Sequence, residues 1–239
     1  MKVLFVGNSH TFFNDMPALF AEMAKKSGAG KVTADMLAYS GRDYAWHRTE
    51  YFALRYALLY GGYDFCVLQQ AAHPYPPAES TLEYGRDLIE MCKRAGVKPV
   101  VYMTWAEKRF PENQQKMTDT CEKLAEETGS LLCRVGQIWQ RILRECPDIE
   151  LFYDDGEHAG PYGDFLIAAA FCRLLARRVD PSVSGIGKSF LIGGPIDMDR
   201  PRMKEDRAAV SCALDAEKTE RILRAVESIQ KPAFDLKRG

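Results

Sequence analysis

Short apolar runs alternate with longer amphipathic stretches over most of this chain, and this alternation limits its fold more than any other feature of the sequence. The apolar runs have the length and composition of buried strands, and they cover residues 3–6, 31–37, 64–68, 98–103 and 131–135. Stretches with helical spacing lie between and after them, over residues 16–26, 44–59, 79–95, 113–128, 138–144 and 162–178. Such repeated strand–helix units are typical of a parallel sheet covered on both faces. The sequence therefore predicts an α/β fold, a flavodoxin-like doubly wound parallel sheet in three α/β/α layers.

The regular alternation ends near residue 180, where the character of the chain changes. Residues 182–195 are rich in glycine and serine and look like a linker, residues 197–206 are charged, and residues 215–229 have the spacing of one more helix. A chain of 239 residues suits one large α/β domain. We therefore expect such a domain over residues 1–180. Residues 181–239 are expected to form a C-terminal extension with one helix, packed on the core.

The composition argues against several classes of partner. The 32 basic and 33 acidic side chains nearly cancel, so no general attraction to nucleic acid or anionic lipid is expected. The N-terminus lacks the apolar core and cleavage site of a signal peptide, and no run of about 18 apolar residues is present. The seven cysteines form no CxxC pair, which argues against a zinc ribbon and fits a reducing compartment. We expect a cytoplasmic protein that binds neither nucleic acid nor membrane and uses no cofactor.

Ligands of open parallel sheets bind at the carboxyl ends of the strands, so the residues there are the first candidates for a site. The first strand is followed by GNSHT at residues 7–11. Gly7 permits a tight turn that would expose the Ser9 hydroxyl. A serine in this place can also be a simple helix N-cap, although Asn14 and Pro17 form a better helix start further on. Position alone leaves both interpretations of Ser9 open.

A second candidate lies in the loop after the fifth strand and its helix, where Asp155 precedes His158 by three positions. A serine hydroxyl needs a base to become nucleophilic, and the base needs a carboxylate that fixes its tautomer. One loop can supply both groups, because residues this far apart can fold back on each other in a single turn. A solvated histidine in an acidic surface loop is the alternative. His47, in a predicted helix, and His73, in a proline-rich loop, are expected to be structural or peripheral.

Together these segments resemble the SGNH (GDSL-type) hydrolases. GNS at residues 7–9 is similar to the first block of that family in a GNS variant, and DGEH at residues 155–158 is similar to its late DxxH block. The resemblance spans about residues 1–178. It implies a serine esterase or acylhydrolase that cleaves a small acyl ester, such as an acetyl group on a carbohydrate, through an acyl-enzyme. It also implies Ser9 as nucleophile, His158 as general base and Asp155 as the residue that orients His158.

The same resemblance implies an oxyanion hole with three donors: the Ser9 N–H, a glycine N–H after the second strand, and an asparagine side chain after the third. Gly41 matches the glycine, although a simple turn glycine would look the same. The family's GxND block is absent, and the third strand ends in an LQ-type block that continues with Gln69 and Gln70. A glutamine carboxamide offers the same N–H donors as asparagine one methylene further out, so either residue can take this role. We expect Gln69 rather than Gln70 to replace the asparagine, because it lies nearer the strand end.

Asn8, Gln70 and Trp105 are expected to line the substrate pocket, although a tryptophan after the fourth strand can equally be a buried packing residue. Three other functions compete with the esterase. A catalytically silent SGNH-like domain would bind carbohydrate or another ligand without cleaving it. A flavodoxin-type protein would bind phosphate at residues 7–11, but a Walker A lysine and a GxGxxG string are missing. A metal hydrolase would use residues 154–158, but one loop rarely supplies a full ligand set, and no metal is expected.

Overall fold

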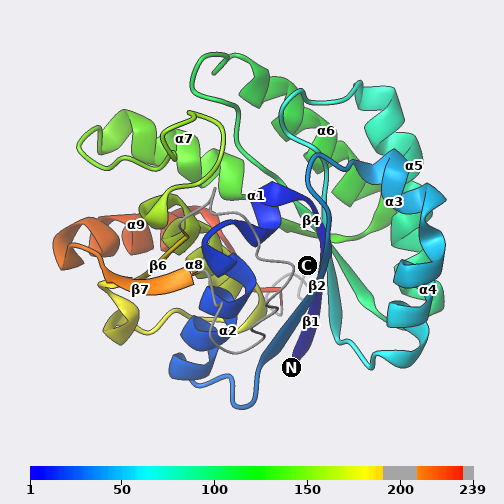
Figure 1. Cartoon of the computed structure of the whole chain (residues 1–239), viewed down its shortest axis with the longest axis horizontal. Coiled ribbons are helices and arrows are strands. Elements are labelled where there is room, and N and C mark those ends of the chain that lie inside the picture. Colours follow the sequence, from blue (N-terminus) through cyan, green and yellow to red (C-terminus); the bar gives the residue numbers. More distant parts are fainter. Residues whose placement is uncertain (191–208, 234–239) are drawn as a thin grey trace, which may run out of the picture.

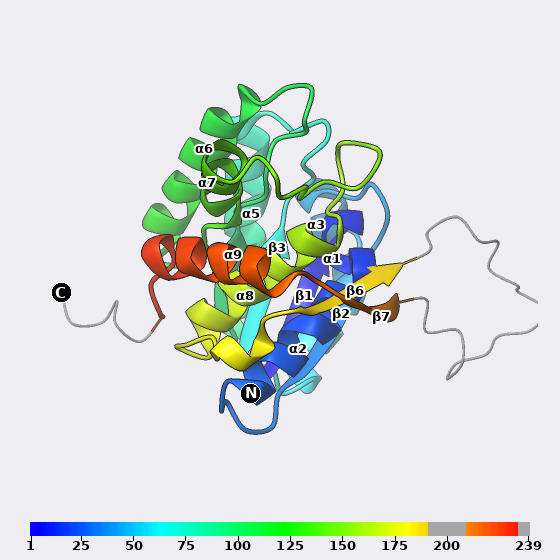
Figure 2. The ribbon, with the colours of Figure 1, turned by 90° about the vertical axis from the view of Figure 1, so that its left-hand side faces the viewer.

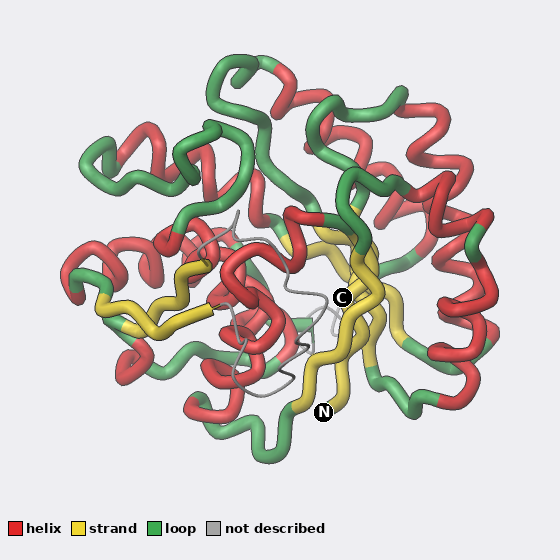
Figure 3. Tube along the Cα trace, viewed as in Figure 1, coloured by secondary structure: helices red, strands yellow, loops and turns green. Residues whose placement is uncertain are grey.

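The computed structural model describes residues 1–190 and 209–233, and its centre is a five-stranded parallel sheet. The strands are β1 (Lys2–Gly7), β2 (Thr33–Ala38), β3 (Phe65–Gln69), β4 (Lys98–Tyr102) and β5 (Leu131–Cys133). They pair in the order β2-β1-β3-β4-β5, and every pairing is parallel. Helices cover both faces of this sheet, as Figure 1 and Figure 3 show. The predicted three-layer α/β/α fold is therefore confirmed.

The helices divide between the two faces of the sheet (Figure 1). One face carries α2 (Met16–Lys26), α7 (Val135–Glu145), α8 (Pro161–Leu175) and α9 (Ala216–Ile229). The other face carries α3 (Tyr44–Thr49), α4 (Tyr51–Tyr60), α5 (Ala78–Arg94) and α6 (Asn113–Thr128). The single helix predicted over residues 44–59 is thus two helices. The chain leaves the helical conformation at Glu50, where ψ is 39°.

The alternation of side chains along each strand produces two separate hydrophobic cores. In β1, Val3 and Phe5 pack into the core beneath α2 and α8, whereas Leu4 and Val6 pack into the core beneath α4 and α5. All four side chains are at most 1% exposed. A continuous apolar run was therefore the correct signal for β1, because both of its faces are covered.

β1 lies inside the sheet, with β2 on one side and β3 on the other. The chain therefore leaves β1 toward one edge and crosses back to continue toward the other edge. Such a reversal opens a crevice at the carboxyl ends of the two central strands, where ligands of this class of sheet bind. The short helix α1 (Ser9–Phe12) begins at this point, directly after β1 (Figure 1).

The region after residue 180 contains a strand pair that the sequence analysis did not predict. β6 (Ile186–Phe190) pairs antiparallel with β7 (Ala209–Ala213), so part of the stretch interpreted as a linker is a strand. α9 follows β7 and lies beside α8 (Figure 2), and its Ile222 and Val226 belong to the same core as α8. The charged stretch at 197–206 lies outside the described residues. Among the described residues, no helix is long and apolar enough to cross a membrane.

Candidate active site

Ser9 follows β1 directly and is the first residue of α1. The N-cap of this helix is Asn8, whose Oδ1 accepts a hydrogen bond from the His10 N–H at 3.0 Å. The cap position is therefore occupied by Asn8, and the Ser9 hydroxyl has another partner. This outcome removes the N-cap interpretation of Ser9 that position in the sequence left open.

The structure brings the three expected triad side chains into one hydrogen-bonded chain. The Oγ of Ser9 lies 2.8 Å from Nε2 of His158, and Nδ1 of His158 lies 2.7 Å from Oδ2 of Asp155. The tautomer that satisfies both contacts has Nδ1–H donating to the carboxylate and Nε2 accepting from the hydroxyl. Such a chain of serine, histidine and aspartate can transfer the hydroxyl proton to the ring and leave a nucleophilic oxygen.

A tight loop holds Asp155 against His158. The other carboxylate oxygen, Oδ1, accepts from the backbone N–H groups of Glu157 at 2.8 Å and His158 at 2.9 Å. Partial burial alone would raise the pKa of Asp155, but these two bonds and the one from the His158 ring outweigh it and lower the pKa below its ordinary value. Asp155 is therefore held in the ionised form that a triad requires.

The segment after β4 is attached to this loop. The Trp105 indole N–H donates to the Glu157 carbonyl at 2.9 Å, and the Lys108 N–H donates to the Gly156 carbonyl at 2.8 Å. The Arg109 guanidinium lies 3.2 Å from the Glu157 carboxylate. Trp105 itself is fully buried and stacked on Trp139 at 4.1 Å. Trp105 therefore supports the loop, and its complete burial favours the second of the two interpretations left open by the sequence, a packing residue rather than a wall of the substrate pocket.

Three aromatic side chains near His158 were not identified from the sequence as part of the site. The Phe13 ring stacks on His158 with centroids 4.0 Å apart, and His10 stacks on the opposite side at 4.8 Å. His73 follows at 4.7 Å from His10, so it is close to the triad rather than peripheral. Burial lowers the pKa of His10 well below its usual range and that of His73 to about 4, so both rings are neutral near pH 7.

Gln69 has a different set of contacts from those of an oxyanion donor. Its side chain is fully buried, and its Oε1 accepts from the Asn8 N–H at 2.8 Å and from the Thr11 hydroxyl at 2.9 Å. Its amide N–H donates to the Gln70 carbonyl. A Cβ on Gly7 would lie only 2.3 Å from Oε1, so a glycine is needed there. These contacts make Gln69 a buried brace of the nucleophile loop, which corrects its expected role.

Replacing Gln69 with leucine is expected to lower the free energy of unfolding by about 1–3 kcal/mol, because the buried Asn8 N–H and the Thr11 hydroxyl lose their acceptor. Urea titration measures this difference. The control is Gln115→Leu, which changes an exposed glutamine on α6 and is expected to shift stability by less than about 0.5 kcal/mol. Equal stability of the two variants would rule out the bracing role of Gln69.

Two of the expected oxyanion donors keep free N–H groups. Within the described residues, neither the Ser9 N–H nor the Gly41 N–H makes a hydrogen bond. Gly41 has φ +68°, a conformation that favours glycine, and no atom lies within 4 Å of the position of a Cβ. The Asn8 side chain donates to the Arg42 carbonyl at 2.9 Å and so connects the glycine turn to the nucleophile loop.

Asn8 and Gln70, the two remaining candidates for the substrate pocket, are almost fully buried, at 2% and 3% exposure. The Gln70 carboxamide accepts from the Tyr44 and Ala71 N–H groups, both at 2.9 Å, and donates to the Thr81 hydroxyl at 3.0 Å. Both side chains therefore brace the loops around the site, and they do not line a pocket as expected.

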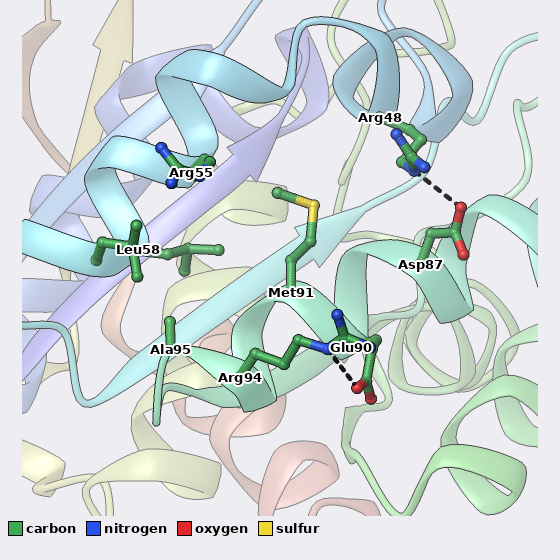
Figure 4. Close-up of a pocket in the computed structure, with 9 residues that line it drawn as sticks. Arg48, Arg55, Leu58, Asp87, Glu90, Met91, Arg94 and Ala95 are labelled. Atoms are coloured by element: carbon green, nitrogen blue, oxygen red, sulfur yellow. Dashed lines mark hydrogen bonds and ion pairs between the residues drawn. The ribbon is translucent and has the colours of Figure 1, made fainter.

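A surface groove of about 680 Å³ lies away from the triad, where α3 and α4 meet α5 (Figure 4). Its walls carry ion pairs at 2.8 Å, between Arg48 and Asp87 and between Arg94 and Glu90. No triad residue lines this groove. Among the described residues, no three histidine, cysteine or carboxylate side chains are grouped as a metal site requires.

Comparison with known proteins identifies solved structures of similar fold. No protein-family model matches the sequence, and no curated protein matches it. Among solved structures, a protein from Slackia heliotrinireducens that is inferred to be an SGNH hydrolase is 28% identical, with a TM-score of 0.63, over 72% of this chain and 97% of that one. The acetylxylan esterase of Geobacillus stearothermophilus is 14% identical, with a TM-score of 0.61, over 72% of this chain and 92% of that one.

A lipase/acylhydrolase from Enterococcus faecalis matches in a similar way, at 13% identity and a TM-score of 0.58, over 72% of this chain and 93% of that one. At these identities, the matches to the acetylxylan esterase and to the lipase/acylhydrolase show a similar fold alone. The chain thus has the fold of the SGNH hydrolases.

Proposed function

We propose that this chain is a serine esterase that cleaves a small acyl ester through an acyl-enzyme, with Ser9, His158 and Asp155 as its catalytic triad. The observation that carries the proposal is the continuous hydrogen-bonded chain from the Ser9 hydroxyl to the Asp155 carboxylate, at 2.8 Å and 2.7 Å. A histidine that is itself oriented by a carboxylate is the arrangement that activates a serine hydroxyl as a nucleophile. The SGNH fold of the chain supports the same reaction class.

The proposed reaction has two halves. In the first, His158 Nε2 accepts the proton of Ser9 as Oγ attacks the ester carbonyl, and the protonated ring then gives that proton to the departing alcohol. In the second half, water attacks the acyl-enzyme with His158 again as base, and the acid leaves as Ser9 regains its proton. The free N–H groups of Ser9 and Gly41 would stabilise the negative oxygen of each tetrahedral intermediate.

We further propose that the acyl group is small, and that an acetyl ester of a carbohydrate is the substrate. The exposed ring of Tyr39 lies 4.8 Å from that of Trp46. Tyr39 is close to the nucleophile loop, because its N–H donates to the Gly7 carbonyl at 3.0 Å. The two rings are inclined by 53°, and the exposed face of Tyr39 is a surface on which a sugar ring can stack. The acetylxylan esterase among the structural neighbours supports this substrate class.

The proposal is tested with p-nitrophenyl acetate and a fluorophosphonate probe. We expect release of p-nitrophenol and covalent labelling of Ser9, located by mass spectrometry of the digested protein. Ser9→Ala is the control and should neither hydrolyse the ester nor take the label. A wild-type protein that shows neither hydrolysis nor labelling would favour the silent, ligand-binding alternative.

A further inference from the structure

The ring of His158 is enclosed on both faces. Phe13 lies almost parallel to it, with an interplanar angle of 12° and centroids 4.0 Å apart. On the other face, His10 is inclined by 28° at 4.8 Å. Phe13 and His10 are both at most 5% exposed, so packing holds their positions. The catalytic ring is thus held between two rings from the segment that also carries the nucleophile.

Hydrogen bonds alone restrain the orientation of the His158 ring only in part. Rotation about the Cβ–Cγ bond moves both Nδ1 and Nε2 relative to their partners, but hydrogen bonds tolerate angular deviations of about 30°. The χ2 torsion of histidine is broad and resists such a tilt of the ring only weakly. Contact with a flat group on each face removes this freedom, because any tilt drives the ring edges into Phe13 or His10.

His10 fulfils two conditions for this role. Burial, together with the neighbouring His73 and His158, lowers its pKa and outweighs the opposing effect of the Glu157 carbonyl, so the ring is neutral and does not repel a protonated His158. Its Nδ1 lies 3.3 Å from Oδ1 of Asn8, the cap of α1. The orientation of His10 is therefore linked to the loop that sets the Ser9 hydroxyl.

Other charged groups occur around this stack. Glu107 raises and Arg109 lowers the pKa of His73, the next ring beyond His10, and Asp155 raises it. Glu107 and Arg109 pair with each other at 2.7 Å, which offsets much of their separate influence. The faces of His158 thus contact neutral rings, while the Asp155 carboxylate is bonded to the ring at Nδ1 and Glu107 and Arg109 act on His73, the ring beyond His10.

We propose that His10 is a positioning residue, a neutral imidazole that clamps His158 together with Phe13 and keeps Nε2 aligned on the Ser9 hydroxyl. This inference rests on the proposed esterase function. His10 takes no part in proton transfer, and its effect reaches the reaction only through the orientation of His158.

The test compares His10→Ala, which opens one face of His158, with His10→Phe, which keeps a flat ring there. We expect His10→Ala to lower kcat by a factor of about 10–100 with KM nearly unchanged, since a misplaced base costs about that much. His10→Phe should recover kcat to within a factor of about three. If His10→Phe is as impaired as His10→Ala, or if His10→Ala keeps wild-type kcat, the clamp is wrong.

A second readout does not depend on hydrolysis. The His158 Nδ1 proton, bonded to a carboxylate at 2.7 Å, should give a low-field NMR resonance that is assigned by its loss in Asp155→Asn. We expect this resonance to broaden or vanish in His10→Ala and to persist in His10→Phe, with urea midpoints reporting that both variants fold. If the resonance stays sharp in His10→Ala, the proposed clamp is wrong. If the resonance behaves as expected but the wild-type protein does not hydrolyse the ester, only the proposed esterase function is refuted.

Discussion

Replacing His158 with alanine is expected to lower kcat for p-nitrophenyl acetate by a factor on the order of 10⁶, because no base is left to accept the Ser9 proton. His158 is the only residue whose ring nitrogen makes a hydrogen bond to the Ser9 hydroxyl among the described residues, at 2.8 Å. Labelling of Ser9 by the fluorophosphonate should slow in parallel, since it depends on the same activation. Steady-state kinetics and the labelling rate measure the two effects.

The variant must fold for this comparison to hold. The side chain of His158 is 18% exposed, so its removal leaves a partly solvated gap between Phe13 and His10 and costs little packing. Urea midpoints of the variant and the wild type report this directly. If His158→Ala folds and keeps both turnover and labelling, another base activates Ser9. His10 and His73 are then the next candidates, because they lie in the same stack of rings.

The sequence predicted the centre of the sheet well because β1, β3 and β4 are buried on both faces and are therefore mostly apolar. The break at Glu50 was not predicted, since apolar residues continue on both sides of it and periodicity alone favours one helix. β6 and β7 were missed for another reason. Each is five residues long, and they pair across an intervening 18 residues, from 191 to 208, so no local pattern marks them.

The triad residues were recognisable because strand ends and a three-residue spacing are visible in the sequence. The role of Gln69 was not recognised, because it depends on which way the side chain points. Gln69 lies two residues after Val67 and shares its face, which directs the carboxamide toward Asn8 and Thr11. The rings around His158 could not be predicted either. The turn that positions Phe13 contains Asn14 and Asp15 in the left-handed region, at φ 47° and 55°, which no spacing rule indicates.

Replacing Asp155 with asparagine is expected to lower kcat by a factor on the order of 10⁴, through the tautomer of His158. The backbone N–H groups of Glu157 and His158 both donate to Oδ1 of Asp155, so an asparagine should place its oxygen there and its NH₂ where Oδ2 now lies. That NH₂ would donate to Nδ1 of His158 and move the ring proton to Nε2. A protonated Nε2 cannot accept the Ser9 proton, although all side chains keep their positions.

Asp154→Asn is the matched control, because it removes the same charge from the neighbouring, exposed residue and should leave kcat within a factor of about two. The free energy of unfolding at acid pH also distinguishes the two variants. The pKa of Asp155 is lower in the folded than in the unfolded chain, so its contribution to stability is present above the ordinary aspartate pKa of about 3.9 and is lost as pH falls below it. Asp155→Asn should therefore lose less stability than the wild type between about pH 5 and pH 2. Equal kcat for Asp155→Asn and Asp154→Asn would mean that the carboxylate does not control the tautomer, and that the rings of Phe13 and His10 alone hold His158 ready for Ser9.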